Sequence, residues 1–216
     1  AMGTRAGKGS KKAFHELTDA GGRIGVFFPS LYRVNYRNHR KIAVIDGTVG
    51  FIGGFNIGDE YLGTGPLGYW RDTAVRIVGD AVKLLQLRFV LDWNYATGEY
   101  PGYEPAYFPP VGMHTGTTPV QVVSCGPDTR WSPIKEGYIK LIYAARESVY
   151  IQSPYFIPDD SVTDALRLAA LSGVDVRVMI PCKPDHPFVY WASLSFVADL
   201  LDAGVRAYTY DNGFIH

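Results

Sequence analysis

The stretch 38–56 contains residue types whose spacing suits chemistry on a phosphate group. His39 and Lys41 stand two positions apart. Because side chains alternate along a strand, their imidazole and ammonium groups are expected on one face. A neutral imidazole can attack phosphorus, while an ammonium offsets charge on the non-bridging oxygens. No metal is expected here, since the ammonium would repel a divalent ion and no second His or Cys stands nearby at ligand spacing.

Two short runs rich in β-branched residues must position this pair. They are separated by the dipeptide Asp46-Gly47, which tolerates the positive φ angles of a tight turn. We therefore predict an antiparallel hairpin. Beyond its second strand, Gly54 and the glycine before it permit a close turn of the backbone, and Asn56 can donate its amide to another phosphate oxygen.

The pattern His-x-Lys-x4-Asp-x6-Gly-Gly-x-Asn resembles the signature of the phospholipase D superfamily, whose usual Ser is replaced here by Gly54. The following segments, 57–63 and 69–73, are similar to the branch of bacterial cardiolipin synthases. The resemblance implies an α/β fold, a sandwich of two similar repeats. Each repeat would be a mixed, largely parallel sheet flanked by helices. A buried hairpin with an incidental His and Lys is the alternative.

The resemblance also implies roles for the motif residues. His39 would attack the phosphodiester, and Lys41 and Asn56 would hold the phosphoryl oxygens, with no metal or organic cofactor required. As a motif residue Asp46 is implied to be catalytic, but seven positions of extended strand at about 3.3 Å each put it on the order of 23 Å along the chain from His39. We therefore expect Asp46 at the hairpin turn in a structural role, and Asp72 as the carboxylate that orients His39.

Further substrate contacts are expected from three residues besides Asn56. These are Gly54 in the motif, Arg40 in a basic cluster, and Tyr155 in a segment that resembles the family after a strand. The basic cluster also contains Arg33, Arg37 and Lys41 and suits an anionic ligand, although a solvated basic face is the alternative. Tyr155 would line a lipid or headgroup pocket; the alternative is a packed aromatic.

An internal repeat predicts a second catalytic histidine. The order Leu-x-Asp-Ala-Gly-x-Arg occurs at 17–23 and again at 200–206. His39 follows the first copy and His216 the second, so His216 is expected to be the counterpart of His39 and to serve as proton donor and then base. The second motif would continue beyond His216, and we expect the chain to be a fragment, cut at both ends and inactive alone.

The second half of the chain alternates between strand and helix patterns, which is typical of an α/β fold with parallel strands. The expected domains are a first repeat at 1–98, a Pro/Gly-rich linker at 99–119 and a second repeat at 120–216. Expected helices lie at 11–20, 80–95, 132–145, 159–171 and 187–201, and expected strands, besides the hairpin, at 23–28, 72–78, 120–124, 148–153, 175–180 and 205–210.

The amino-acid composition limits which partners and which cellular compartment the sequence favours. Lys plus Arg equals Asp plus Glu at 21 each, so no global basic field favours nucleic acid. Cys125 and Cys182 form no disulfide framework, which suits a reducing compartment. No apolar run approaches the length needed to span a bilayer. From the resemblance we expect anchoring to the bacterial inner membrane by segments before Ala1, with the catalytic part on the cytoplasmic side.

Three functions remain open at this stage. The first is phosphatidyl transfer between two phosphatidylglycerol molecules at a membrane surface, making cardiolipin and glycerol through a phosphohistidine intermediate. The second is hydrolysis of a lipid or nucleic-acid phosphodiester by the same residues. The third is an inactive lipid-binding fragment. Which histidine attacks is assigned by resemblance alone.

Overall fold

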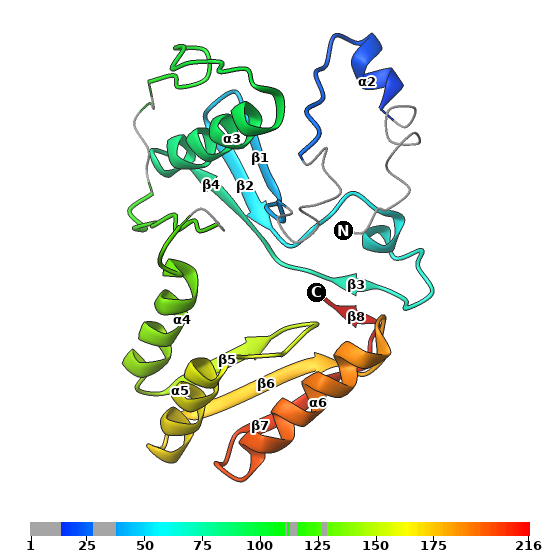
Figure 1. Cartoon of the computed structure of the whole chain (residues 1–216), viewed down its shortest axis with the longest axis vertical. Coiled ribbons are helices and arrows are strands. Elements are labelled where there is room, and N and C mark those ends of the chain that lie inside the picture. The colour runs from blue at the N-terminus through cyan, green and yellow to red at the C-terminus, as the bar shows by residue number, and fades with distance from the viewer. Residues whose placement is uncertain (1–13, 28–37, 111, 113–115, 127–128) are drawn as a thin grey trace. The chain divides into compact units, whose positions relative to one another are not determined.

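The chain forms two compact units in the computed structural model, which describes residues 14–27, 38–110, 112, 116–126 and 129–216 (Figure 1). Unit 1 consists of Ala1–Ile52 and Val75–Val122, and unit 2 of Gly53–Ala74 and Val123–His216. This division differs from the expected boundaries, because the segment after the hairpin packs with the second half of the chain. The two-repeat organisation stays a prediction.

Unit 1 contains the predicted hairpin. Strands β1 (Ile42–Ile45) and β2 (Val49–Gly53) pair antiparallel, and β4 (Ala74–Val78) follows β2 in the sheet. Asp46 and Gly47 have φ angles of 52° and 64°, as the turn prediction requires. Helix α3 (Ala81–Thr97) packs its buried side chains Val82 and Leu85 in one cluster with apolar residues of β1 and β4. The hairpin prediction is confirmed.

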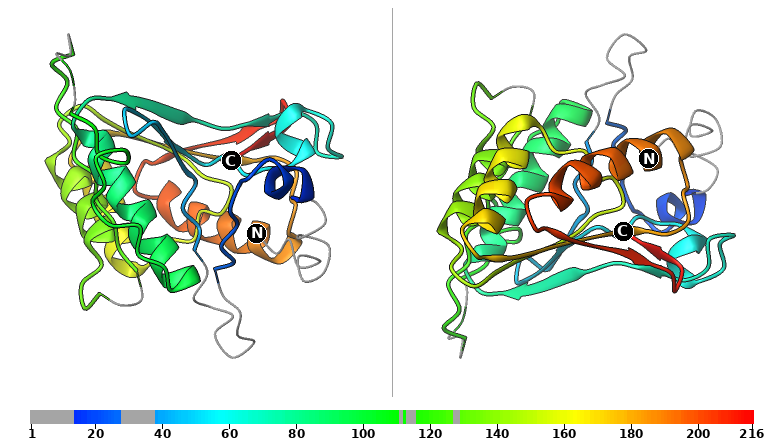
Figure 2. Two further views of the ribbon diagram at one scale, coloured as in Figure 1. Left: turned by 90° about the horizontal axis from the view of Figure 1, so that it is seen from above. Right: turned by 90° about the horizontal axis from the view of Figure 1, so that it is seen from below.

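Unit 2 contains a parallel three-stranded sheet in the order β5 (Ser148–Gln152), β6 (Asp175–Pro181), β7 (Arg206–Tyr210). Its helices are α4 (Pro133–Ala144), α5 (Asp160–Leu171) and α6 (Pro187–Leu201), each within two residues of the predicted bounds. Asp159 caps α5 by accepting a hydrogen bond from the Val162 backbone N–H. The views in Figure 2 show α5 and α6 on the same side of this sheet.

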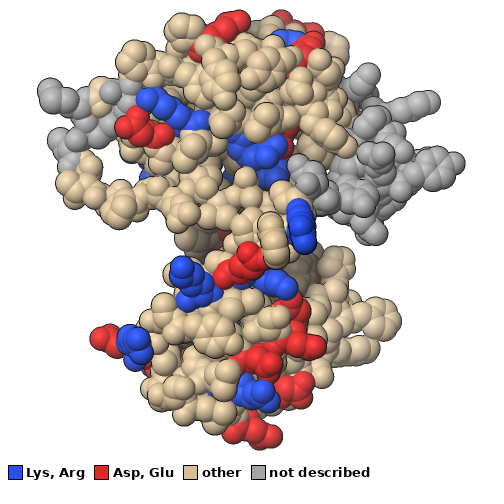
Figure 3. All heavy atoms as spheres, turned by 60° about the vertical axis from the view of Figure 1, so that its left-hand side comes forward, with Lys and Arg blue, Asp and Glu red and all other residues tan. Residues whose placement is uncertain are grey.

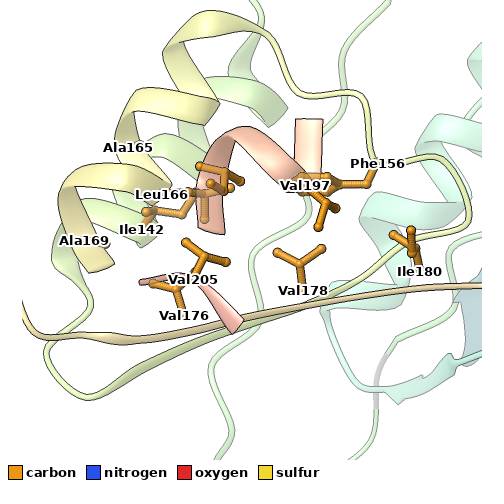
Figure 4. Close-up of a cluster of buried hydrophobic side chains, with 11 residues drawn as sticks. Ile142, Phe156, Ala165, Leu166, Ala169, Val176, Val178, Ile180, Val197 and Val205 are labelled. Atoms are coloured by element: carbon orange, nitrogen blue, oxygen red, sulfur yellow. The ribbon is translucent and has the colours of Figure 1, made fainter. Parts of the chain in front are cut away.

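Alternation along β6 creates the core of unit 2. Val176, Val178 and Ile180 are 1–2% exposed, and Figure 4 shows them projecting toward side chains of the helices. Leu166 on α5 is fully buried in the same cluster, whereas Leu168, two residues later, is 47% exposed. The helix therefore presents one apolar face to the sheet, as its 3.6-residue period requires.

Three expectations for secondary structure need correction. The described residues 23–27 and the segment 120–124 do not form strands, and only residues 74–78 of the expected strand 72–78 form one. Helix α2 (His15–Asp19) lies within the expected helix at 11–20, whose residues 11–13 are outside the described part of the chain. A strand needs a hydrogen-bonded neighbour, so an alternating pattern alone does not form one. Two short strands that we did not predict, β3 (Trp70–Arg71) and β8 (Phe214–Ile215), pair with each other.

Surface charge is mixed on the face shown in Figure 3, where basic and acidic side chains lie among one another. None of the helices in the described part of the chain is both long and apolar enough to cross a bilayer.

The core assignment predicts unequal costs for two leucines of α5. Leu166→Ala removes a fully buried side chain, and we expect it to lower the free energy of unfolding by about 2–5 kcal/mol. Leu168→Ala, on the exposed side of the same helix, is the matched control and should cost less than about 1 kcal/mol. Urea unfolding of the two variants measures the difference, and equal costs would contradict the packing described here.

Candidate active site

Pairing between β3 and β8 brings two candidate residues together within unit 2. The strands are parallel, with Trp70 opposite Phe214 and Arg71 opposite Ile215. The backbone N–H of His216 donates to the Arg71 carbonyl at 2.9 Å, so the ladder continues one step past the strands. Asp72 and His216 are the next residues on each side, and alternation places their side chains on the face that carries Trp70 and Phe214.

The carboxylate of Asp72 binds the imidazole of His216. Asp72 Oδ2 lies 2.7 Å from His216 Nδ1, and the two side chains are only 3% and 15% exposed. The second carboxylate oxygen accepts the Thr73 backbone N–H at 2.6 Å. Because an ionised carboxylate only accepts hydrogen bonds, Nδ1 carries the proton and Nε2 remains to take up or release one.

This geometry corrects the expected partner of Asp72. We predicted that Asp72 orients His39, but its carboxylate is engaged by His216 and by the Thr73 backbone. The prediction considered only the hairpin and the strand after it. The pairing of β3 with β8 joins residues 144 positions apart, and no local pattern reveals it.

Gly54 lies against the same carboxylate. A Cβ atom at this position would stand 2.5 Å from both carboxylate oxygens of Asp72, closer than real Cβ contacts allow. The glycine therefore provides room for the Asp72 side chain where the resembled motif has Ser. Direct contact of Gly54 with substrate stays a prediction.

Aromatic rings surround His216 in unit 2. The Trp70 ring centroid lies 5.5 Å from that of His216, and the Tyr61 ring meets His216 edge-on at 5.6 Å. The amide nitrogen of Asn56 donates to the Tyr61 hydroxyl at 2.8 Å, which places the predicted phosphate ligand beside the histidine. We did not single out Tyr61 or Trp70 from the sequence, although both lie in the segments that resemble the family.

Tyr155, another residue of unit 2, donates its hydroxyl to the carboxylate of Asp185. Burial, and then this hydrogen bond, raises the pKa of the Tyr155 phenol well above its usual range. The side chain keeps its proton at neutral pH and is 40% exposed. Its predicted role in binding a headgroup is compatible with this placement and stays a prediction.

His39 and Lys41 meet in unit 1. The Lys41 ammonium lies 2.8 Å from His39 Nδ1, 3.0 Å from Nε2 and 2.8 Å from the His39 carbonyl oxygen. An ammonium only donates hydrogen bonds, so this contact favours a neutral imidazole. The expected pairing of the two groups is confirmed, although β1 begins only at Ile42.

Arg40, between His39 and Lys41, forms an ion pair with Asp92 of helix α3. Its guanidinium lies 3.2 Å from Asp92, which also binds the Asn38 amide at 2.9 Å and Arg88 at 2.7 Å. These contacts give Arg40 a structural role, and its substrate contact stays a prediction. Two other members of the basic cluster, Arg33 and Arg37, lie outside the described residues.

Asp46 occupies the turn, as expected. It is exposed and has a positive φ angle, a conformation that Asp tolerates better than most residues. The structure gives it the position of a turn residue, in agreement with its predicted structural role. Its catalytic role within the motif stays a prediction.

The fit of Gly54 against Asp72 predicts an unusual cost for a small substitution. Gly54→Ala forces a methyl group onto the carboxylate, and we expect a loss of about 1–3 kcal/mol in unfolding free energy. Gly137→Ala in α4 is the control, because a Cβ there meets nothing within 4 Å and should stabilise the helix by about 0.5–1 kcal/mol. When Asp72 is also replaced by Ala, the loss of unfolding free energy caused by Gly54→Ala should largely disappear. An unchanged loss would contradict the contact between Gly54 and the Asp72 carboxylate.

Comparison with known proteins agrees with the motif. Residues 138–216 match the family described as "Cardiolipin synthase, PLD-like domain". The chain is 57% identical to the major cardiolipin synthase of Bacillus subtilis (strain 168) over 95% of its length. It is 56% identical to a cardiolipin synthase of Staphylococcus aureus (strain Mu50) over its whole length, and 56% identical to cardiolipin synthase 1 of S. aureus (strain COL) over 94%.

The chain spans 42–44% of the length of these three relatives. Among solved structures, a polyphosphate kinase from Porphyromonas gingivalis matches 38% of this chain and 12% of its own, at 17% identity and a TM-score of 0.28. The sequence matches along the whole chain, together with the motif from His39 to Asn56, show that the chain belongs to the phospholipase D superfamily, in the branch of the bacterial cardiolipin synthases.

Proposed function

We propose that the complete protein is a phosphatidyltransferase that makes cardiolipin from two molecules of phosphatidylglycerol and releases glycerol. The part-buried Asp72–His216 pair is the observation that carries the proposal, because it equips one imidazole for proton transfer. The imidazole of His39 beside the Lys41 ammonium supports a separate nucleophile. The names of the relatives support the choice of product.

In the first step, a ring nitrogen of His39 attacks the phosphorus of one phosphatidylglycerol. A phosphorus–nitrogen bond forms, and the bond from phosphorus to the headgroup glycerol oxygen breaks. His216, protonated on both nitrogens, gives its Nε2 proton to the departing oxygen, so that glycerol leaves as a neutral alcohol. The products of this step are phosphatidyl-His39 and glycerol.

In the second step, a headgroup hydroxyl of another phosphatidylglycerol attacks the same phosphorus. His216 Nε2 accepts the hydroxyl proton, the new phosphorus–oxygen bond forms, and the phosphorus–nitrogen bond breaks. Cardiolipin leaves, His39 is restored, and His216 is again protonated. Two phosphatidylglycerol molecules have then given one cardiolipin and one glycerol.

Charged and polar neighbours reduce the cost of both steps. The ammonium of Lys41 and the amide of Asn56 would stabilise negative charge on the phosphoryl oxygens. Asp72 stabilises the imidazolium form of His216 and fixes its ring, as the buried aspartate does in a serine-protease triad. The partner in this proposal is an anionic phospholipid at a membrane surface. Anchoring to the bacterial inner membrane would come from segments outside this chain, with the catalytic part on the cytoplasmic side.

The nucleophile assignment predicts a trapped intermediate in the complete protein. With phosphatidylglycerol labelled in its phosphate, wild-type protein quenched during turnover should carry acid-labile, base-stable phosphate on His39. His39→Ala should lose the label and lower turnover by about 10³ or more, since the covalent route is removed. His15→Ala, which changes an exposed histidine of unit 1 that pairs with Asp19, is the matched control and should keep both.

Products of the same assay separate transfer from hydrolysis. Glycerol and cardiolipin in equal amounts are expected, whereas phosphatidic acid in place of cardiolipin would show that water is the acceptor. Label on neither His39 nor His216 would rule out the covalent mechanism.

A further inference from the structure

Tyr61 connects two motif residues that the sequence places far apart. It lies in the short 3-10 helix η2 (Asp59–Leu62) of unit 2. Its hydroxyl accepts the Asn56 amide N–H at 2.8 Å and lies 3.4 Å from His216 Nδ1. The latter distance is long compared with the 2.7 Å from Nδ1 to Asp72, so the carboxylate is the main partner of the imidazole and Asn56 is the main partner of the phenol.

The ring of Tyr61 is held by aromatic neighbours on several sides. Its centroid lies 5.3 Å from that of Trp70, 5.6 Å from Phe55 and 5.6 Å from His216, in tilted or edge-on arrangements. Aromatic rings at these separations and angles attract one another. The hydroxyl therefore occupies a fixed position, and an amide that binds it is fixed as well.

The phenol is suited to this task because it stays neutral. Burial raises the pKa of the Tyr61 hydroxyl above its ordinary value, and the nearby charge of Asp72 acts in the same direction. A phenolate here would repel the carboxylate that orients His216. A neutral hydroxyl accepts the amide hydrogen bond without adding charge.

Fixing the Asn56 amide has a direct consequence for the site. The amide has two N–H groups, and its nitrogen and oxygen can exchange places by a flip of the side chain. With one N–H on Tyr61, the nitrogen is held beside His216, and the second N–H is the one left for a phosphoryl oxygen.

We infer that Tyr61 is a positioning residue that orients the Asn56 amide for binding to the phosphoryl group. The inference rests on the proposed function for its role in turnover, while the orientation of the amide can be measured without any substrate. Tyr61→Phe is the natural test, because the ring and its aromatic contacts remain and only the hydroxyl is lost.

In the complete protein, we expect Tyr61→Phe to lower kcat for phosphatidylglycerol about tenfold, with little change in KM or melting temperature, as expected for loss of one aligned hydrogen bond. In an Asn56→Ala background the same change should have no further effect, because Tyr61 acts through Asn56. Tyr69→Phe, at a tyrosine that is 59% exposed on the same segment, is the matched control and should leave kcat within about twofold of wild type. The inference would be overturned if kcat of the double variant were lower than that of Asn56→Ala by the full factor lost in Tyr61→Phe. A wild-type kcat in Tyr61→Phe would also overturn it.

A second measurement keeps the two proposals separable. In the NMR spectrum of the 216-residue chain, the two side-chain N–H protons of Asn56 should be widely separated, and Tyr61→Phe should reduce that separation. Unchanged Asn56 resonances in Tyr61→Phe would overturn the inference even if kcat fell. If wild-type protein did not turn over phosphatidylglycerol but the Asn56 resonances responded as expected, the proposed function would fail and the positioning role would stand.

Discussion

The hydrogen bond between the Asp72 carboxylate and the His216 imidazole is the interaction on which the site in unit 2 depends. A carboxylate that is only 3% exposed is costly unless its oxygens accept hydrogen bonds. His216 Nδ1 and the Thr73 backbone N–H meet this requirement. The β3–β8 ladder sets the distance between the two side chains, and Gly54 leaves room for the carboxylate.

The backbone at Gly213 shows how tightly the two strands are joined. Its φ angle is +117°, and a Cβ atom there would overlap the carbonyl oxygen of Tyr69. Glycine is therefore required where β8 approaches β3. The Phe214 N–H donates to that same carbonyl at 3.0 Å. This is the first hydrogen bond of the ladder between β8 and β3, which continues to the His216 N–H.

Surroundings differ between the two histidines in a way that suits different chemical tasks. His216 is mostly buried, carries its Nδ1 proton toward a carboxylate and is fixed by aromatic rings. His39 is exposed and has an ammonium beside its ring. The Asp72 contact leaves Nε2 of His216 for proton transfer, whereas the Lys41 ammonium stands beside the imidazole proposed as the nucleophile.

Local patterns in the sequence predicted the parts of the fold that depend on neighbouring residues. The turn at Asp46, the strand at 175–180 and the helix at 159–171 were all predicted because each is decided within a few positions. The partner of Asp72 was not, since it depends on β3 and β8, strands of two residues each. Segments this short carry no readable periodicity, and their pairing follows from the tertiary fold.

The tautomer of His216 tests the central claim most directly. Long-range ¹⁵N NMR of the chain, recorded at a pH where the imidazole is neutral and assigned with His216→Gln, distinguishes the protonated ring nitrogen from the unprotonated one. The Asp72 contact predicts a proton on Nδ1 and a lone pair on Nε2. A proton on Nε2 would contradict the account, because Asp72 would then not orient the imidazole.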